Sequence, residues 1–377
     1  MADPHVSRAS SPSPLLALPS AVDSAAGSVD HGVAWHYGDP FTEQRAATTG
    51  VAVVDRSHRA GIRLAGDERL SWLHSITSQH LTALPDRSSA EDLVLDIAGH
   101  VEQHFVLTDL DGVTWIDTEP THGAALLDYL QKMVFWAKAE PTASDELAVL
   151  TLLGPDLEHG ALADLVPVPD RPYAATPLPG GGFVRRMPWP GEHAADLLVP
   201  RDQMVQWWQR LTAAGAAPAG MWAFEALRVE AKRPRLGLDT DERAIPHELG
   251  WIGGVDEAGA VHLDKGCYRG QETVARVHNL GKPPRNLVLL HLDGSADGRP
   301  EVGDPVVTAE GRTVGRVGTV VDHHELGPVA LALVKRTIPA DTPLTAGPCA
   351  AAIDPDSMPA QDLFQPGRAA VDRLRGR

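Results

Sequence analysis

The sequence predicts an α+β fold followed by a small antiparallel β-barrel, and three observations support this. Apolar strand patterns and amphipathic helical patterns are interleaved over the first 230 residues or so, in an order typical of sheets covered by helices on one face. After Pro283-Pro284 only short strand patterns remain, separated by Gly- and Asp-rich turns. The chain has 377 residues, of which 43% are hydrophobic and 22% charged, as in ordinary globular proteins of two or three domains.

The predicted elements follow in chain order. Strands are expected at 50–55, 62–67, 93–96, 101–108, 113–117, 148–153, 182–188 and 195–199. Helices are expected after Asp67, where Leu70, Leu73 and Ile76 share one face, and then at 121–135, 203–214 and 221–231. Barrel strands are expected at 286–292, 304–308, 312–321 and 329–335.

These elements suggest four regions. Residues 1–30, rich in Ser, Ala and Pro, are expected to be a disordered tail. Residues 31–284 form two α+β subdomains with a break near 155–180, and the Pro- and Gly-rich stretch 160–182 is expected to be a loop. Residues 285–354 form the barrel. Residues 355–377 are a second tail.

Charge and cysteine content exclude several classes of protein. A net charge of -17 argues against non-specific binding of nucleic acid, although a local RNA contact stays open. Two cysteines, Cys267 and Cys349, cannot form a disulfide scaffold, which fits a reducing, cytoplasmic setting. No apolar run reaches the length of about 18 residues that a transmembrane helix needs.

The most informative stretch is 264–276, which contains Cys267. Gly266 and Gly270 bracket the thiol, and a short helix is expected from Gln271 to a stop at Gly281. The positive end of that helix, with Lys265 and Arg269 nearby, should favour the thiolate. Five Lys or Arg residues against one acid between 265 and 285 predict an anion-binding pocket. The alternative is that Cys267 is a buried small apolar residue beside a solvated helix face.

Residues 265–272, Lys-Gly-Cys-Tyr-Arg-Gly-Gln-Glu, resemble the signature of the YgfZ family. Members of that family are folate-binding relatives of the glycine cleavage T-protein, an aminomethyltransferase, and act in iron–sulfur cluster assembly or repair. The resemblance implies a GcvT or T-protein-like folate-binding fold that ends in the antiparallel barrel. It also implies tetrahydrofolate as the cofactor and Cys267 as the reactive group.

A second stretch, Met221–Ala231 with Pro234 after it, resembles the T-protein segment Leu-Arg-x-Glu-Ala-Gly-x-Pro, whose Glu binds the pterin ring. The resemblance assigns that role to Glu230. A carboxylate suits it because it can accept hydrogen bonds from two parallel N–H donors. Trp222 and Phe224 offer flat faces for the folate rings. The residues assigned to cofactor contact are Glu230, Arg228, Lys265, Tyr268, Arg269 and Glu102.

One departure separates this chain from T-protein chemistry. Where T-proteins carry two Asp residues in a Gly-Gly-x-x-Asp-Asp segment, this chain has Glu102-Gln103. The residues therefore leave open whether the protein is an enzyme. The alternatives to an iron–sulfur role are a tetrahydrofolate-dependent aminomethyltransferase or demethylase and an accessory factor in tRNA modification.

The expected partners are a reduced folate and iron–sulfur apoproteins or their assembly machinery, with no membrane and no general nucleic-acid contact. Two groups have the composition of a metal site, His100 with Glu102 and His104, and the run Asp322–Glu325. Neither has zinc spacing with an evident further ligand, so no metal site is expected. His58, in a segment like the family's Asp-x-Ser-His, fits a structural role as well as a pocket role.

Overall fold

The computed structural model describes residues 12–358. These residues belong to two compact units. The first unit comprises the described residues up to Leu73, Leu81–Ala90 and Phe105–Leu227, and the second comprises His74–His80, Glu91–His104 and the described residues from Arg228 onward. The second unit is thus assembled from three separate stretches of sequence, whereas we expected regions that follow one another along the chain.

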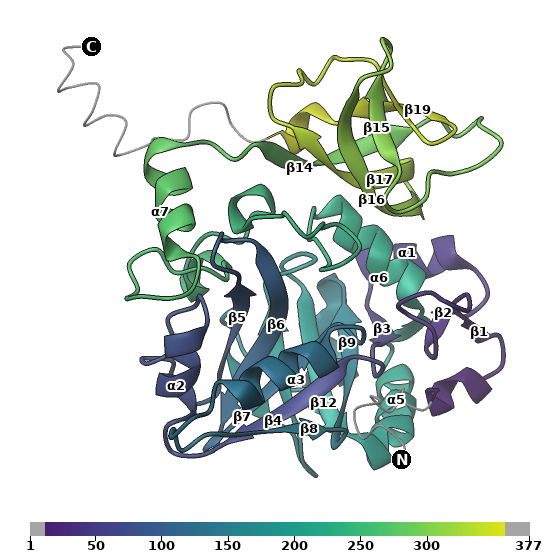
Figure 1. Cartoon of the computed structure of the whole chain (residues 1–377). Coiled ribbons are helices and arrows are strands. Elements are labelled where there is room, and N and C mark those ends of the chain that lie inside the picture. Colours follow the sequence, from purple (N-terminus) through teal and green to yellow (C-terminus); the bar gives the residue numbers. More distant parts are fainter. Residues whose placement is uncertain (1–11, 359–377) are drawn as a thin grey trace, which may run out of the picture. The chain divides into compact units, whose positions relative to one another are not determined.

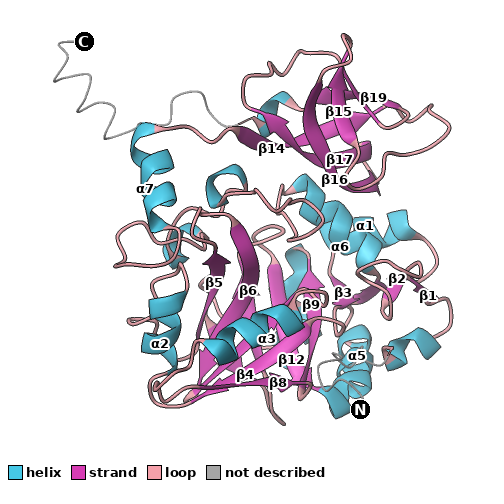
Figure 2. Cartoon of the chain, viewed as in Figure 1, coloured by secondary structure: helices cyan, strands magenta, loops and turns pink. Residues whose placement is uncertain are grey.

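Two sheets carry most of the strands before residue 230 (Figures 1 and 2). The six-stranded sheet has the order β10-β11-β12-β9-β3-β13, in which only β13 pairs parallel to its neighbour. Its strands are β3 (Ala52–Asp55), β9 (Leu147–Leu153), β10 (Ala175–Pro177), β11 (Phe183–Met187), β12 (Ala194–Pro200) and β13 (Ala217–Ala219). The five-stranded sheet has the order β5-β6-β7-β4-β8, built from β4 (Ala60–Ala65), β5 (Ser88–Leu95), β6 (Val101–Leu110), β7 (Val113–Thr118) and β8 (Glu140–Ser144).

Helices pack on these sheets through their apolar faces. In the first unit α3 contacts β4 and β8, and α5 contacts β3 and β12 (Figure 1). Trp207 and Trp208 of α5 are both buried in the core of the first unit. The α-helices are α1 (Pro40–Thr49), α2 (Arg69–Ile76), α3 (Gly123–Lys132), α4 (Gly160–Leu165), α5 (Met204–Ala213), α6 (Met221–Glu230) and α7 (Gln271–Leu280).

The C-terminal strands close into an antiparallel barrel in the order β14-β17-β16-β15-β18-β19, with β19 paired back to β14. This confirms the predicted α+β fold with a small antiparallel barrel. Alternate side chains fill the barrel interior, and Cys349 is among them. The strands are β14 (Arg285–Leu292), β15 (Pro305–Thr308), β16 (Thr313–His323), β17 (Gly327–Lys335), β18 (Leu344–Ala346) and β19 (Cys349–Ile353).

The N-terminal segment differs from the expected disordered tail. Residues 1–11 lie outside the described residues, but residues 12–30 contain a 3₁₀ turn, Pro14–Ala17, and β1 (Val22–Asp23), which pairs with β2 (Ala34–His36). Leu15 is buried in the main core of the first unit, and the Ser13 hydroxyl donates to Asp55. One buried leucine and a buried hydrogen bond are enough to order a segment whose composition reads as a linker.

Two further expectations need adjustment. The stretch 160–182, expected to be a loop, contains α4 and the short strand β10. Of the expected tail 355–377, Pro355–Ser357 form a 3₁₀ turn capped by Asp354, and residues 359–377 lie outside the described part of the chain.

Candidate functional site

The loop that contains Cys267 lies in the second unit and alternates between buried and exposed residues. Lys265 and Tyr268 are buried, whereas Gly266 and Cys267 between them are exposed. Helix α7 begins at Gln271 after Gly270, whose φ of +82° only glycine adopts without strain. The expected helix and its glycine start are therefore present, and the alternative of a buried Cys267 is wrong.

Lys265 does not face solvent as an anion-binding residue would. Its Nζ donates to the backbone oxygens of Thr77 (2.6 Å), Gln79 (3.0 Å) and His74. An ammonium group has three donors, so all of them are used inside the protein. Burial lowers the pKa of Lys265 to about 8, against the opposing effect of buried Asp92. Lys265 thus bonds to backbone oxygens of the protein, and its contact with a ligand stays a prediction.

Tyr268 is the second buried residue of the motif. Its ring lies under the Lys265 ammonium, with Nζ 5.5 Å from the ring centroid, and burial raises the pKa of its hydroxyl to about 12. A phenol this deep in the loop packs the motif from within.

Arg269 and Glu102, both predicted to contact the cofactor, are brought together. Arg269 Nη1 lies 2.9 Å from Glu102 Oε2, and both side chains are about two-fifths exposed. The neighbouring Gln103 is buried, and its Oε1 has no hydrogen-bond partner within the described residues. The position at which T-proteins carry an acid pair thus holds one carboxylate engaged by an arginine and one buried amide.

Arg228 is also buried in the second unit rather than presented to a ligand. It donates to Asp239 Oδ2 at 2.8 Å and to Thr319 Oγ1 at 2.6 Å, and its side chain is 1% exposed. Asp239 Oδ1 in turn accepts the Thr319 amide at 2.7 Å. Arg228 therefore fastens the end of α6 to barrel strand β16, and its contact with a cofactor stays a prediction.

Glu230 is the predicted pterin ligand that keeps an accessible carboxylate. It is the last residue of α6, its side chain is 48% exposed, and Oε2 lies 3.3 Å from His323 Nε2. His323 Nδ1 accepts two backbone amides, so the ring proton resides on Nε2 and faces the carboxylate. This interaction lowers the pKa of Glu230. No sequence pattern pairs Glu230 with His323, which lies in one of the two groups considered as metal ligands.

The five basic residues between 265 and 285 do not form the expected anion-binding pocket. Lys265 is buried, Arg269 is paired with Glu102, and Arg285 is bound by the carboxylates of Asp241 and Glu248. The charges of Arg269 and Arg285 are thus neutralised by carboxylates within the second unit. Counting charges along the sequence could not reveal partners supplied by other segments.

Other candidates have internal partners too. His104 pairs with buried Glu91 at 2.7 Å and stacks on Trp251, and His100 pairs with Asp96 at 2.9 Å. Within residues 12–358 no group of three or more His, Cys, Asp or Glu side chains is arranged to hold a metal ion.

In the first unit His58 Nε2 lies 3.0 Å from buried Asp30, which supports its structural role. Trp222 stacks on Trp35, with ring centroids 5.6 Å apart, and Phe224 packs under the Arg56 guanidinium. The faces of both rings that we expected to meet folate are therefore in contact with protein.

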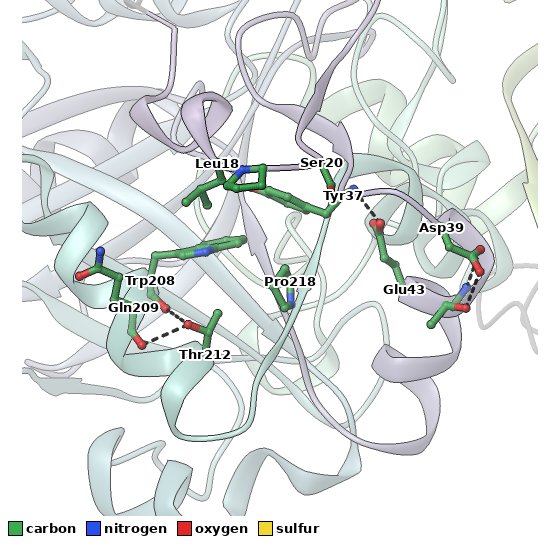
Figure 3. Close-up of a pocket in the computed structure, with 11 residues that line it drawn as sticks. Leu18, Ser20, Tyr37, Asp39, Glu43, Trp208, Gln209, Thr212 and Pro218 are labelled. Carbon is green, nitrogen blue, oxygen red and sulfur yellow. Dashed lines mark hydrogen bonds between the residues drawn. The ribbon is translucent and has the colours of Figure 1, made fainter.

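The first unit also contains an open pocket of about 510 Å³ between the N-terminal segment, α1 and α5 (Figure 3). Tyr37 and Trp208 both line it and pack against each other, with ring centroids 5.4 Å apart. The carboxylate of Glu43 already accepts the backbone amides of Tyr37 and Gly220, and Asp39 caps α1. None of the predicted site residues lines this pocket, and its acids already have protein donors.

Among the described residues, no helix is both long enough and apolar enough to span a bilayer.

The GCVT N-terminal domain matches residues 33–256, which is more than half of the chain, and the CAF17 C-terminal beta-barrel domain matches residues 285–360. The crystal structure of glycine cleavage system aminomethyltransferase T from Bartonella henselae superimposes with a TM-score of 0.77 over 93% of this chain and 97% of that one. At 19% identity this likeness shows the fold.

Curated relatives include aminomethyltransferases and a transferase. The aminomethyltransferase of Nitrosococcus oceani is 29% identical over 57% of this chain and 61% of its own length. The chloroplastic putative transferase of Arabidopsis thaliana is 28% identical over 72% of this chain and 62% of its own length. The aminomethyltransferase of Synechococcus elongatus is 29% identical over 73% of this chain and 74% of its own length. The chain thus covers about three fifths of the length of the first two relatives. By its matched domains, the chain belongs to the GCVT domain family, in a CAF17-like form related to the aminomethyltransferases.

Proposed function

We propose that this protein binds a reduced folate in the cytoplasm and acts in iron–sulfur cluster assembly or repair, as a YgfZ-type member of its family, with Cys267 as the reactive group. The observation that carries the proposal is the exposed thiol of Cys267 within the motif at residues 265–272. The family membership and the CAF17-like barrel support the folate and iron–sulfur parts. The expected partners are iron–sulfur apoproteins or their assembly machinery.

The two cysteines provide a test of the thiol within one molecule. Cys267 is exposed on its loop, whereas Cys349 is buried in the barrel interior with its Sγ 3.4 Å from the Gly298 carbonyl oxygen. We expect iodoacetamide at neutral pH to label Cys267 much faster than Cys349, as read by peptide mapping. Cys267→Ser should fold normally and fail to restore iron–sulfur enzyme activity in a deletion strain. Full complementation by that variant would refute a role for the thiol.

Folate binding rests on Glu230, the exposed carboxylate at the end of α6. Tetrahydrofolate titrated calorimetrically into the protein should bind, and Glu230→Gln should cost about 1.5–3 kcal/mol, the contribution of a hydrogen bond to a charged group. That corresponds to a loss of about ten- to a hundred-fold in affinity. Glu242→Gln, which changes an exposed glutamate in the same unit, is the matched control. Equal folate affinity for the two variants would remove Glu230 from the proposal.

The second candidate is tetrahydrofolate-dependent aminomethyl transfer, which the names of the curated relatives favour. Against it, Glu102 is engaged by Arg269, and Gln103 carries no charge where the family has an acid. We expect no turnover when the protein replaces T-protein in a reconstituted glycine cleavage assay. Activity in that assay, abolished by Glu102→Gln, would reverse the order of the two candidates.

A further inference from the structure

Two loops far apart in sequence are tied together next to Cys267, and both belong to the second unit. Residues 77–79 meet residues 259–265 through several hydrogen bonds: the Ser78 hydroxyl donates to Ala260 O at 2.7 Å, Gln79 Nε2 donates to Gly259 O at 2.8 Å, and the His262 amide donates to Ser78 O at 3.1 Å. These bonds fix one end of the segment that leads to the thiol.

The loop at 77–79 is itself held in place. The buried carboxylate of Asp92 on β5 accepts the backbone amides of Ser78 at 3.0 Å and Gln79 at 2.8 Å through Oδ1. A carboxylate that accepts consecutive amides fixes the direction of the chain, so the carbonyl groups of the loop have a defined orientation. The carbonyls of Thr77 and Gln79 point at the Lys265 ammonium.

Lys265 is the nearest side chain before Cys267 that reaches this loop. Its ammonium bridges carbonyls of three different residues, so it joins the two loops at one point. On the far side of the thiol, Gln271 Nε2 donates to Lys265 O at 3.2 Å, and Tyr268 is buried. Gly266 and Cys267 are thus an exposed turn between two buried residues.

We infer that Lys265 is a positioning residue, whose buried ammonium holds the segment 265–268 against residues 74–79, the end of α2 and the loop that follows it, and thereby presents the Cys267 thiol outward in one orientation. The inference rests on the proposed function, in which Cys267 is the reactive group. In this inference the role of Lys265 is to orient the Cys267 thiol, and it does not bind an anion or a folate.

The test uses the full chain with a nitroxide label on Cys267, because the exposed thiol reacts while Cys349 is buried. Lys265→Met keeps the apolar stem and removes the three donors. We expect a more mobile nitroxide spectrum and about tenfold faster hydrogen exchange for amides in 74–80 and 262–268. Tyr268→Phe, which keeps the buried ring, is the control and should leave the spectrum as in the parent.

Two outcomes would overturn the inference: a nitroxide spectrum in Lys265→Met as restricted as that of the parent, or unchanged exchange in both loops combined with weaker tetrahydrofolate binding. If Lys265→Met does not fold, Ser78→Ala tests the same contact between the two loops, because it removes the hydrogen bond from Ser78 to Ala260 O. It should also increase the mobility of the nitroxide.

Cellular activity separates the inference from the function on which it rests. Lys265→Met should lower iron–sulfur enzyme activity in a deletion strain while its thiol still alkylates. If Cys267→Ser complements fully while Lys265→Met still mobilises the loop, the proposed function fails and the positioning role stands.

Discussion

Arg228 and Lys265 are both basic residues buried in the second unit, but their charges are compensated in different ways. Arg228 meets a buried carboxylate, Asp239, together with the Thr319 hydroxyl. Lys265 meets three backbone carbonyls, and Asp92 acts on it only through space. A guanidinium paired with a carboxylate stays charged throughout the pH range of folded proteins, whereas an ammonium desolvated among neutral dipoles gives up its proton more readily.

The difference separates two kinds of attachment in one unit. Arg228 and Asp239 join α6 to the barrel strand β16, where β16 has a bulge between Val317 and Val320 that frees the Thr319 amide for Asp239. Lys265 joins the segment that contains Cys267 to residues 74–79, beside the bonds that Ser78 and Gln79 make to residues 259–260. The first attachment is a permanent part of the fold, and the second is a titratable contact beside the candidate reactive group.

The largest expected effect breaks the first attachment. Asp239→Ala removes a buried carboxylate that pairs with the buried Arg228 guanidinium, which should lower the free energy of unfolding by about 3–5 kcal/mol. Urea-induced unfolding measures this loss. Arg269→Ala, which breaks the exposed pair with Glu102, is the matched comparison and should cost at most about 1 kcal/mol. Similar losses for the two variants would show that Asp239 is not the partner on which the buried charge depends.

The second prediction concerns pH and distinguishes the two cations directly. The folded-state pKa of Lys265 is about 8, below its ordinary 10.5, because burial disfavours the ammonium. Between those values the unfolded chain binds more protons at this site than the folded chain, so stability should rise with pH. The expected slope is about 1.4 kcal/mol per pH unit. This contribution should be lost as the pH falls through 8.

Lys265→Met removes that titration, so the difference in unfolding free energy between parent and variant should grow in favour of the parent from about pH 8 to about pH 10. Parallel denaturation series across this range measure it. A difference that stays constant would mean that folding does not lower the pKa of Lys265.

The third and smallest effect sharpens the picture of the loop by comparing its two glycines. Gly270 has a φ of +82°, and a Cβ there would lie 2.7 Å from Asp96 O, whereas a Cβ on Gly266 would meet nothing within 4 Å. Gly270→Ala should therefore cost about 1–3 kcal/mol, and Gly266→Ala should leave stability within about 0.5 kcal/mol. Thermal unfolding of both variants compares them. A larger loss for Gly266→Ala would contradict the arrangement in which only Gly270 is sterically confined.

Local patterns predicted most of the fold. The strand pattern in 101–108 and the helical spacing of Leu70, Leu73 and Ile76 correspond to β6 and α2. The elements that the sequence analysis missed are short or lack such a pattern. They include β8, β10, β18 and β19. A three-residue strand buries too few side chains to leave a period in the sequence.

The candidate site was predictable only in part. The exposed Cys267 and the glycine before α7 follow from the motif itself. The burial of Lys265 and Arg228 could not be predicted, because lysine and arginine are rarely buried, and their partners are backbone carbonyls or residues up to 191 positions away. Backbone acceptors leave no signature in the sequence. The sequence therefore suggests that Lys265 activates the Cys267 thiol, and it gives no sign that the lysine bonds to backbone carbonyls.

The closure of the barrel around Cys349 also fixes how the protein behaves on oxidation. The chain has two cysteines, one exposed and one enclosed, so each folded molecule offers a single sulfur atom to another. Air oxidation of the folded protein can then form a disulfide between two molecules but cannot link a third. Each molecule has one accessible thiol, and the first disulfide uses it. Non-reducing electrophoresis should show a dimer band without a ladder above it, and higher species would indicate that barrels have opened.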